Sequence, residues 1–209
     1  MDTTKKTLSM GFTKEHFPVG THMCLIYDND EERKQIVSKY LAAGIEDDEQ
    51  VRLFTDAVGE EEVRSWLQPM GVTLPAGPEG DGFRIFDPVH AYCPSGRFDP
   101  EAMVGGLMHR YEEAKRAGYT GVRSCGEMSW VLKGIPGSER FLEYEALLNK
   151  PRGNFPHIGM CQYDARLFDG ATLFKVLQLH PFMIAHGQII SNPFYQRPEE
   201  FQAELPSRQ

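Results

Sequence analysis

The side chains best suited to chemistry in this sequence are cysteine and histidine residues within short apolar segments. His22 and Cys24 lie two positions apart in a segment that predicts a strand, so both side chains point to the same face. Cys125 and Cys161 stand in two further strand-like segments, and thiolate and imidazole groups are typical ligands of soft metal ions. Buried cysteines in central strands also serve simply as small apolar side chains, which is the interpretation that we favour. A metal- or thiol-dependent function stays open as an alternative, and the sequence identifies no cofactor.

Polar side chains also gather where the predicted strands end, which is where ligands bind in parallel α/β sheets. Asp28 and Asp164 follow two such strands, and we interpret them as caps of the helices that come next. Glu127 is the better binding candidate, because its neighbours Gly126 and Trp130 would leave the carboxylate partly desolvated. A purely structural hydrogen bond is the equal alternative for this side chain.

Short strand-like runs alternate with helical runs along most of the chain. Strands are expected over residues 22–27, 51–55, 83–86, 121–125 and 157–163, with one or two more between 182 and 195. Helices are expected to begin at Asp28-Asn29-Asp30, Glu60, Asp99-Pro100 and Ser138, and a short one ends at His180, a cap rather than a ligand. The alternation predicts a three-layer α/β domain, with a mostly parallel sheet and helices on both faces. We place this single domain at residues 15–197 and expect flexible tails at 1–14 and 198–209.

Composition and charge exclude several classes of protein. The 209 residues are 41% hydrophobic and 25% charged, which is ordinary for a folded domain. A net charge of −8 argues against direct nucleic-acid binding, which needs clustered lysine and arginine. No apolar run approaches the roughly 18–20 residues of a membrane span. Because the first residues lack the apolar core of a secretory signal and the four cysteines lie far apart, we expect a cytoplasmic globular protein.

Familiar catalytic and nucleotide-binding motifs are missing from the sequence. The acidic segment from Tyr27 to Glu32 stands where a phosphate-binding G-x-x-x-x-G-K-[ST] loop would follow the first strand, and its charge would repel a triphosphate. Val122 occupies the position where a nucleophile elbow around Ser124 needs its first glycine. No C-x-x-C or H-E-x-x-H pattern is present. The sequence therefore favours a protein that is not an enzyme.

A series of short blocks follows in order between about residues 20 and 196. The first blocks are His22-x-Cys24-x-x-Tyr27-Asp28, Gly96-Arg97-Phe98-Asp99 and Gly118-Tyr119-x-Gly121-x-Arg123. The later blocks are Gly126-Glu127-Met128-Ser129-Trp130, Glu143-Tyr144-Glu145-x-x-Leu148-Asn149, Cys161-Gln162-Tyr163-Asp164, His180-Pro181 and Asn192-Pro193-Phe194-Tyr195. In their joint order and spacing they resemble the MEDS family, the methanogen and methylotroph sensory domain, also described as DcmR-like.

The resemblance implies a ligand-sensing regulatory module with a RecA-like fold that has lost its phosphate loop. A small organic ligand, such as a hydrocarbon derivative, would bind at the carboxyl edge of the sheet against His22, Cys24, Tyr27, Glu127, Trp130, Gln162 and Tyr163. Only about a dozen residues follow Tyr195, so we expect no output domain and a signal that passes to a regulatory or signalling partner protein. A stand-alone sensor, an adaptor and a fragment of a longer chain all fit this expectation, and so does a homodimer. A degenerate nucleotide-binding domain remains a further alternative.

Overall fold

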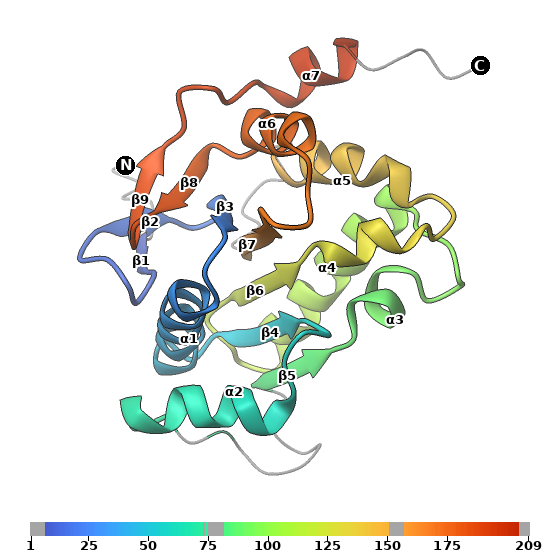
Figure 1. The fold of residues 1–209 in the computed structure, drawn as a ribbon. Coiled ribbons are helices and arrows are strands. Elements are labelled where there is room, and N and C mark those ends of the chain that lie inside the picture. Colours follow the sequence, from blue (N-terminus) through green and yellow to red (C-terminus); the bar gives the residue numbers. More distant parts are fainter. Residues whose placement is uncertain (1–6, 73, 75–81, 151–156, 205–209) are drawn as a thin grey trace, which may run out of the picture.

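A seven-stranded sheet forms the centre of the molecule, as Figure 1 shows for the computed structural model, which describes residues 7–72, 74, 82–150 and 157–204. The strand order is β5-β4-β6-β7-β3-β8-β9, and all strands run parallel except β9, which pairs antiparallel with β8. The strands are β3 (His22–Tyr27), β4 (Gln50–Phe54), β5 (Phe83–Phe86), β6 (Val122–Glu127), β7 (His157–Asp164), β8 (Phe182–Ala185) and β9 (Gln188–Ser191). The prediction of a mostly parallel sheet is therefore confirmed.

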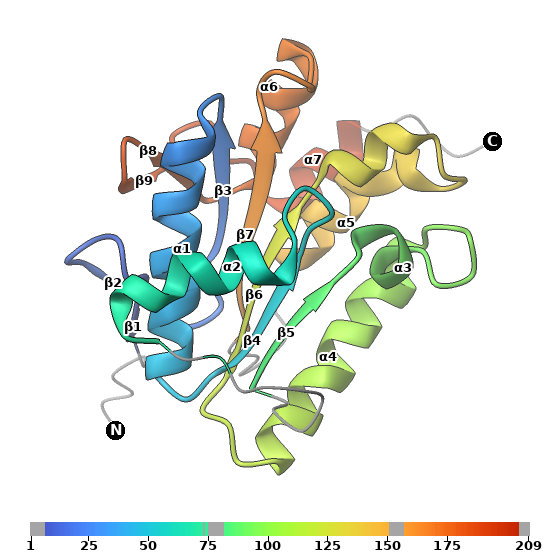
Figure 2. The same cartoon turned by 60° about the horizontal axis from the view of Figure 1, so that its bottom comes forward.

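Helices cover both faces of this sheet, so the three-layer prediction is also confirmed (Figure 2). One face carries α1 (Asp30–Glu46) and α2 (Glu60–Leu67), and the other carries α4 (Pro100–Arg116), α5 (Phe141–Leu148) and α6 (Gly170–Leu179). The short helices α3 (Pro88–Tyr92) and α7 (Pro198–Glu204) complete the described chain. Each face has its own hydrophobic core, and the sheet separates the two.

Strand alternation decides which side chains enter which core. Met23 and Leu25 of β3 pack in the core under α1, whereas Cys24 packs in the core under α4, α5 and α6. Every residue of β7 is buried, because this strand lies in the middle of the sheet with helices over both of its faces. Side chains of consecutive β7 residues therefore lie in different layers of the protein.

The predicted helix starts are mostly where the sequence places them. Asn29 caps α1, and its side-chain oxygen accepts the backbone N–H groups of Glu31 and Glu32 at 2.9 and 3.0 Å. Asp28 therefore does not cap this helix, contrary to our expectation. Ser138 is not a helix cap either, since it begins a short 3₁₀ turn that leads into α5 and makes no side-chain capping bond.

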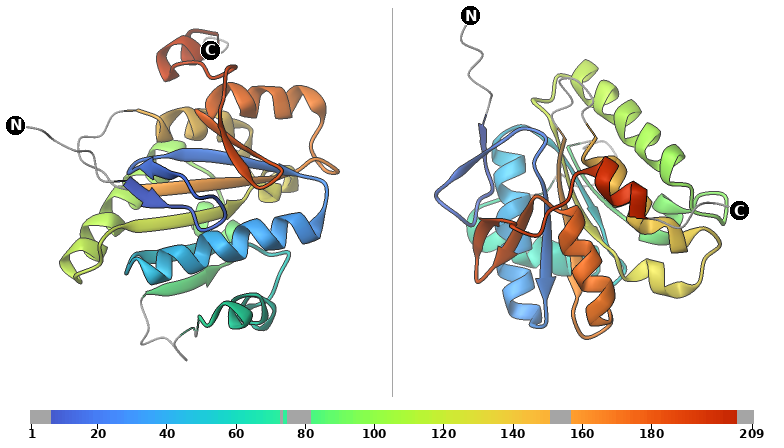
Figure 3. Two further views of the ribbon diagram at one scale, coloured as in Figure 1. Left: turned by 90° about the vertical axis from the view of Figure 1, so that its left-hand side faces the viewer. Right: turned by 90° about the horizontal axis from the view of Figure 1, so that it is seen from above.

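Both expected tails contain packed segments. Strands β1 (Thr7–Ser9) and β2 (His16–Pro18) form a small antiparallel ladder, which lies beside β8 and β9 in Figure 3. Met10 is fully buried, and Phe201 of α7 packs against Leu179. These segments are too short and too polar to stand out in the sequence, and single apolar side chains fix them to the domain. Residues 1–6 and 205–209 of the expected tails lie outside the described residues.

Candidate functional site

The seven residues expected to line one ligand site lie in three different places. Tyr27, Glu127 and Gln162 face the layer of α1, whereas His22, Cys24 and Tyr163 face the layer of α5 and α6. Trp130 is fully buried, and its ring stacks on that of Tyr92 at a centroid distance of 4.9 Å. Because Gln162 and Tyr163 are neighbours in one strand, their side chains must point to opposite faces. The structure therefore does not bring the seven side chains together in one pocket.

A cleft opens at the carboxyl ends of β3, β6 and β7, on the face covered by α1 and α2. Its volume is about 530 Å³, a size typical of small-molecule sites. The residues that line it are Tyr27, Asp30, Glu31, Arg33, Lys34, Ala57, Val58, Glu62, Trp66, Glu127, Asp164, Arg166 and Leu167. Of the seven expected residues, Tyr27 and Glu127 reach this cleft directly, and Gln162 lies beneath it.

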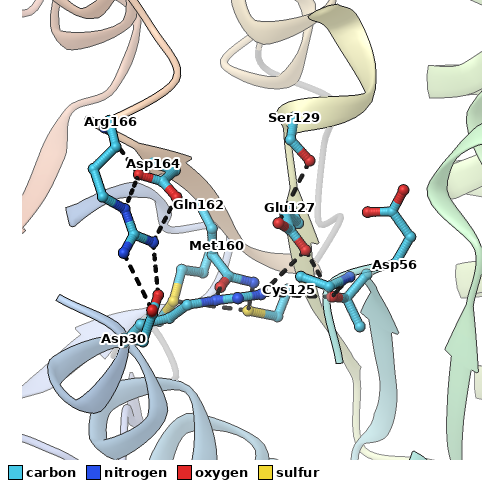
Figure 4. A network of polar contacts seen from close by, with 12 residues as sticks. Asp30, Asp56, Cys125, Glu127, Ser129, Met160, Gln162, Asp164 and Arg166 are labelled. Carbon is cyan, nitrogen blue, oxygen red and sulfur yellow. Dashed lines mark hydrogen bonds and ion pairs between the residues drawn. The ribbon is translucent and has the colours of Figure 1, made fainter. Parts of the chain in front are cut away.

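The floor of the cleft is a buried network centred on Arg33. Its Nη2 lies 3.1 Å from Glu127 Oε2, and its Nε donates to Gln162 Oε1 at 2.8 Å. Thr55 Oγ1 donates to the same Glu127 oxygen at 2.7 Å, and Gln162 Nε2 donates to the thiol sulfur of Cys125 at 3.2 Å. Burial raises the pKa of the Cys125 thiol to about 12, so this thiol is protonated at neutral pH. Figure 4 shows Glu127, Gln162 and Cys125 of this network.

Arg166 lines the cleft and joins the start of α1 to the end of β7. Its guanidinium nitrogens lie 2.7 Å from oxygens of both Asp30 and Asp164. Hydrogen bonds from Arg166 hold the pKa of each of these carboxyl groups below its usual range. Asp164 therefore pairs with an arginine rather than capping a helix, as Figure 4 shows. Burial raises the pKa of the nearby Tyr27 hydroxyl well above its usual value, so it remains a neutral phenol.

A second polar cluster lies inside the molecule on the opposite face of the sheet. His22 Nε2 lies 3.1 Å from Glu145 Oε2 and 3.4 Å from Cys161 Sγ. His180 Nε2 lies 3.3 Å from the same Glu145 oxygen, while Tyr163 donates its hydroxyl to Glu145 Oε1 at 2.7 Å. His180 also ends α6, as expected of a cap, since its Nδ1 lies 2.7 Å from the Val176 carbonyl oxygen.

Burial and mutual interactions shift the pKa values of ionisable groups in this buried cluster. Burial alone would raise the pKa of Glu145, but His180 and His22 outweigh burial and hold that pKa well below its usual range. Burial and the charge of His180 lower the pKa of His22, although Glu145 partly opposes them. Burial, together with the carboxylate of Glu145, raises the pKa of the Cys161 thiol. His22, Glu145, Cys161 and His180 each offer one metal-ligating atom, and these four atoms lie within 4.8 Å of one another.

Several residues of both clusters could not be identified as site residues from the sequence. Arg33 and Arg166 look like ordinary surface arginines in the sequence, and only the tertiary structure turns Arg33 inward. Glu145 carried a signal, because it interrupts an apolar helical run between Tyr144 and Ala146, where a carboxylate needs a partner.

The mostly parallel sheet, the helices on both of its faces and the cleft at the carboxyl ends of its strands define a three-layer α/β domain with a candidate binding site at the sheet edge. The chain belongs to the MEDS family, the methanogen/methylotroph, DcmR sensory domain, whose family model matches residues 21–181. It is similar to the transcriptional repressor DcmR of Methylorubrum extorquens, with 25% identity over 160 residues, which are 76% of this chain and 57% of the repressor. The chain thus spans a little more than half the length of that relative.

Two solved structures from the archaeon Pyrococcus horikoshii share the fold. A KaiC-like protein superposes with a TM-score of 0.56 at 14% identity, covering 86% of this chain and 79% of its own. An uncharacterized protein in complex with an unknown peptide superposes with a TM-score of 0.57 at 15% identity, covering 81% of each chain. These similarities confirm a RecA-like three-layer fold. Among the described residues, no helix has both the length and the apolar composition needed to cross a bilayer.

Proposed function

We propose that this protein is a sensory or regulatory domain that binds a small organic ligand in the carboxyl-edge cleft and signals through a partner protein. The observation that carries the proposal is the floor of that cleft, where Arg33 holds Glu127 and Gln162 in a buried hydrogen-bonded network. Such a floor orients a ligand at little entropic cost. Membership of a family of sensory domains, and similarity to a transcriptional repressor, support a regulatory role in the cytoplasm.

The lining of the cleft indicates the chemistry of the ligand. Tyr27, Trp66 and Leu167 provide apolar contact area, and charged groups of both signs surround them. Five carboxylates and three basic side chains line the cleft, which gives 3 − 5 = −2 in formal charge. A neutral, cationic or zwitterionic molecule with both an apolar part and a polar part fits this lining. A triphosphate does not, and this argues against the degenerate nucleotide-binding alternative.

The arrangement also favours binding over catalysis. Glu127 is engaged by Arg33 and Thr55, and its second oxygen accepts from Ser129 Oγ at 3.4 Å. A general base needs a carboxylate that can take up a proton from substrate, and an ion-paired carboxylate is a poor one. We therefore propose that the protein is not an enzyme and that its output comes from ligand-dependent shifts in the loops around the cleft.

Calorimetry with the full chain tests this proposal. One-carbon compounds, chlorinated hydrocarbons, methylated amines and ATP form the panel, and we expect at least one of the organic compounds to bind and ATP not to bind. Glu127→Gln and Arg33→Lys should weaken that binding at least tenfold. Glu113→Gln, an exposed change on α4 at the opposite face, should leave it unchanged. Equal affinity in all four proteins, or no binding by any compound, would remove the cleft as the sensory site.

A further inference from the structure

We propose that His22, Glu145, Cys161 and His180 form a four-coordinate binding site for a divalent transition-metal ion, and that zinc is the ion that fits it best. The four residues come from β3, α5, β7 and the end of α6, and all four are buried. The site lies on the other face of the sheet from the cleft, so this inference does not depend on the proposed function.

Four of the separations between ligand atoms match those of a tetrahedron around zinc. Zinc bonds of about 2.0–2.3 Å place neighbouring nitrogen and oxygen ligands about 3.3 Å apart, and sulfur about 3.6 Å from either. The separations of Glu145 Oε2 from His22 Nε2 and His180 Nε2 are 3.1 and 3.3 Å. Cys161 Sγ lies 3.4 Å from His22 Nε2 and 3.6 Å from Glu145 Oε2. Ligand atoms from all four residues lie within 4.8 Å of one another.

The outer partners of both histidines leave the correct nitrogen free to bind a metal. His22 Nδ1 lies 3.1 Å from Asn149 Oδ1, and His180 Nδ1 lies 2.7 Å from the Val176 carbonyl oxygen. Because each of these acceptors takes the Nδ1 proton, Nε2 of both rings carries a lone pair that points at the shared centre. Asn149 is itself oriented by hydrogen bonds from its Nδ2 to the carbonyl oxygens of Glu145 and Leu179. His180 Nε2 makes no directed hydrogen bond in the described structure, as expected of a metal ligand.

The charges of the four side chains also favour a bound divalent ion. Glu145 is 0% exposed and Cys161 is 5% exposed, and a buried carboxylate needs a compensating positive charge. Among the described residues, the basic side chains within ion-pair distance of Glu145 are His22 and His180, and neither a lysine nor an arginine pairs with it there. A divalent ion bound by one carboxylate, one thiolate and two neutral imidazoles makes a centre with no net charge. Tyr163 then orients Glu145 by its hydrogen bond to Oε1, which leaves Oε2 for the metal.

Four protein ligands in a closed interior define a structural rather than a catalytic centre, because no position is left for water or substrate. The ion would join α5 and the end of α6 to the two central strands. A zinc ion at this place would stabilise the layer opposite the cleft.

Elemental analysis of the full, untagged chain is the first test. We expect about one zinc ion per chain in the unchanged protein and less than about a fifth of that in Cys161→Ser and His180→Gln. Cys24→Ser changes a neighbouring buried thiol on the same face and should keep the metal. Zinc retained by the ligand variants, or absent from the unchanged protein grown with added zinc, would overturn the proposal.

A second test needs no variant, since ligand variants can fail to fold. The metal is removed from the unchanged protein with a strong chelator, and cobalt(II) is added in its place. We expect a thiolate-to-cobalt charge-transfer band, the intense visible bands of tetrahedral cobalt, and a melting temperature that falls on metal removal and recovers with zinc. If the melting temperature does not change on metal removal and the cobalt spectra are octahedral, the cluster is a hydrogen-bond network only.

Discussion

Arg33 and Glu127 lie 94 positions apart in the sequence and meet as a buried ion pair at the floor of the cleft, with 3.1 Å between Nη2 and Oε2. Their side chains are only 7% and 6% exposed. The pair joins α1 to the carboxyl end of β6, so the site depends on the packing of helix on sheet. A ligand that contacts either partner acts on both elements.

Breaking this pair from one side should destabilise the protein strongly. Arg33→Met leaves the Glu127 carboxylate buried without its cation, and we expect the free energy of unfolding to fall by about 3–5 kcal/mol. Urea denaturation followed by circular dichroism measures the change. The double variant Arg33→Met/Glu127→Leu removes both charges and should recover most of the loss. A double variant no more stable than Arg33→Met would show that the charge is not the cause.

The carboxyl groups held by Arg166 should respond to its removal. Their pKa values are lowered in the folded protein, so the stability that they contribute is complete above the unfolded pKa, near 4, and is lost as the pH falls through the lowered folded pKa. Arg166→Ala should raise the pKa of Asp30 and Asp164 and flatten the loss of stability below about pH 4. Carboxyl carbon NMR titration reports both pKa values directly. Unchanged titration curves would contradict the bridging role of Arg166.

The first strand should contribute to stability although it lies outside the family match. Removal of residues 1–14 deletes buried Leu8 and Met10 and the hydrogen bond from Arg123 Nη2 to the Ser9 carbonyl oxygen. We expect the free energy of unfolding to fall by roughly 2–5 kcal/mol. A chain that starts at Thr7 keeps these contacts and serves as the control. Equal stability of the two shortened chains would show that β1 is dispensable.

Tyr163 should act on the buried cluster through Glu145. Tyr163→Phe removes the hydrogen bond to Glu145 Oε1, and loss of such an outer partner typically lowers metal affinity 10–100-fold. A competing chelator should therefore remove zinc from the variant at a lower chelator concentration than from the unchanged protein. The metal content before competition should stay the same. Tyr195→Phe, a tyrosine outside the cluster, serves as the matched control. Identical competition curves for all three proteins would exclude a role for Tyr163.

The sequence predicted the fold well because hydrophobic periodicity and helix caps are local signals. Asp99, for example, caps α4 as expected, and the carboxyl-edge position of Glu127 follows from where β6 ends. The common site for Gln162 and Tyr163 was wrong for a reason that the same periodicity contains, since neighbours in a strand face opposite ways. Glu145 and Arg33 could not be placed, because the inward face of a helix depends on how it packs against the sheet.

Gln162 and Tyr163 are consecutive residues of β7, so a single peptide bond joins the two clusters. One of them hydrogen-bonds Arg33 beneath the cleft, and the other hydrogen-bonds Glu145 in the buried cluster. The two clusters therefore contact opposite faces of the same strand. A displacement of β7 by a fraction of an ångström changes the polar geometry on both faces at once, so neither cluster can be repositioned alone.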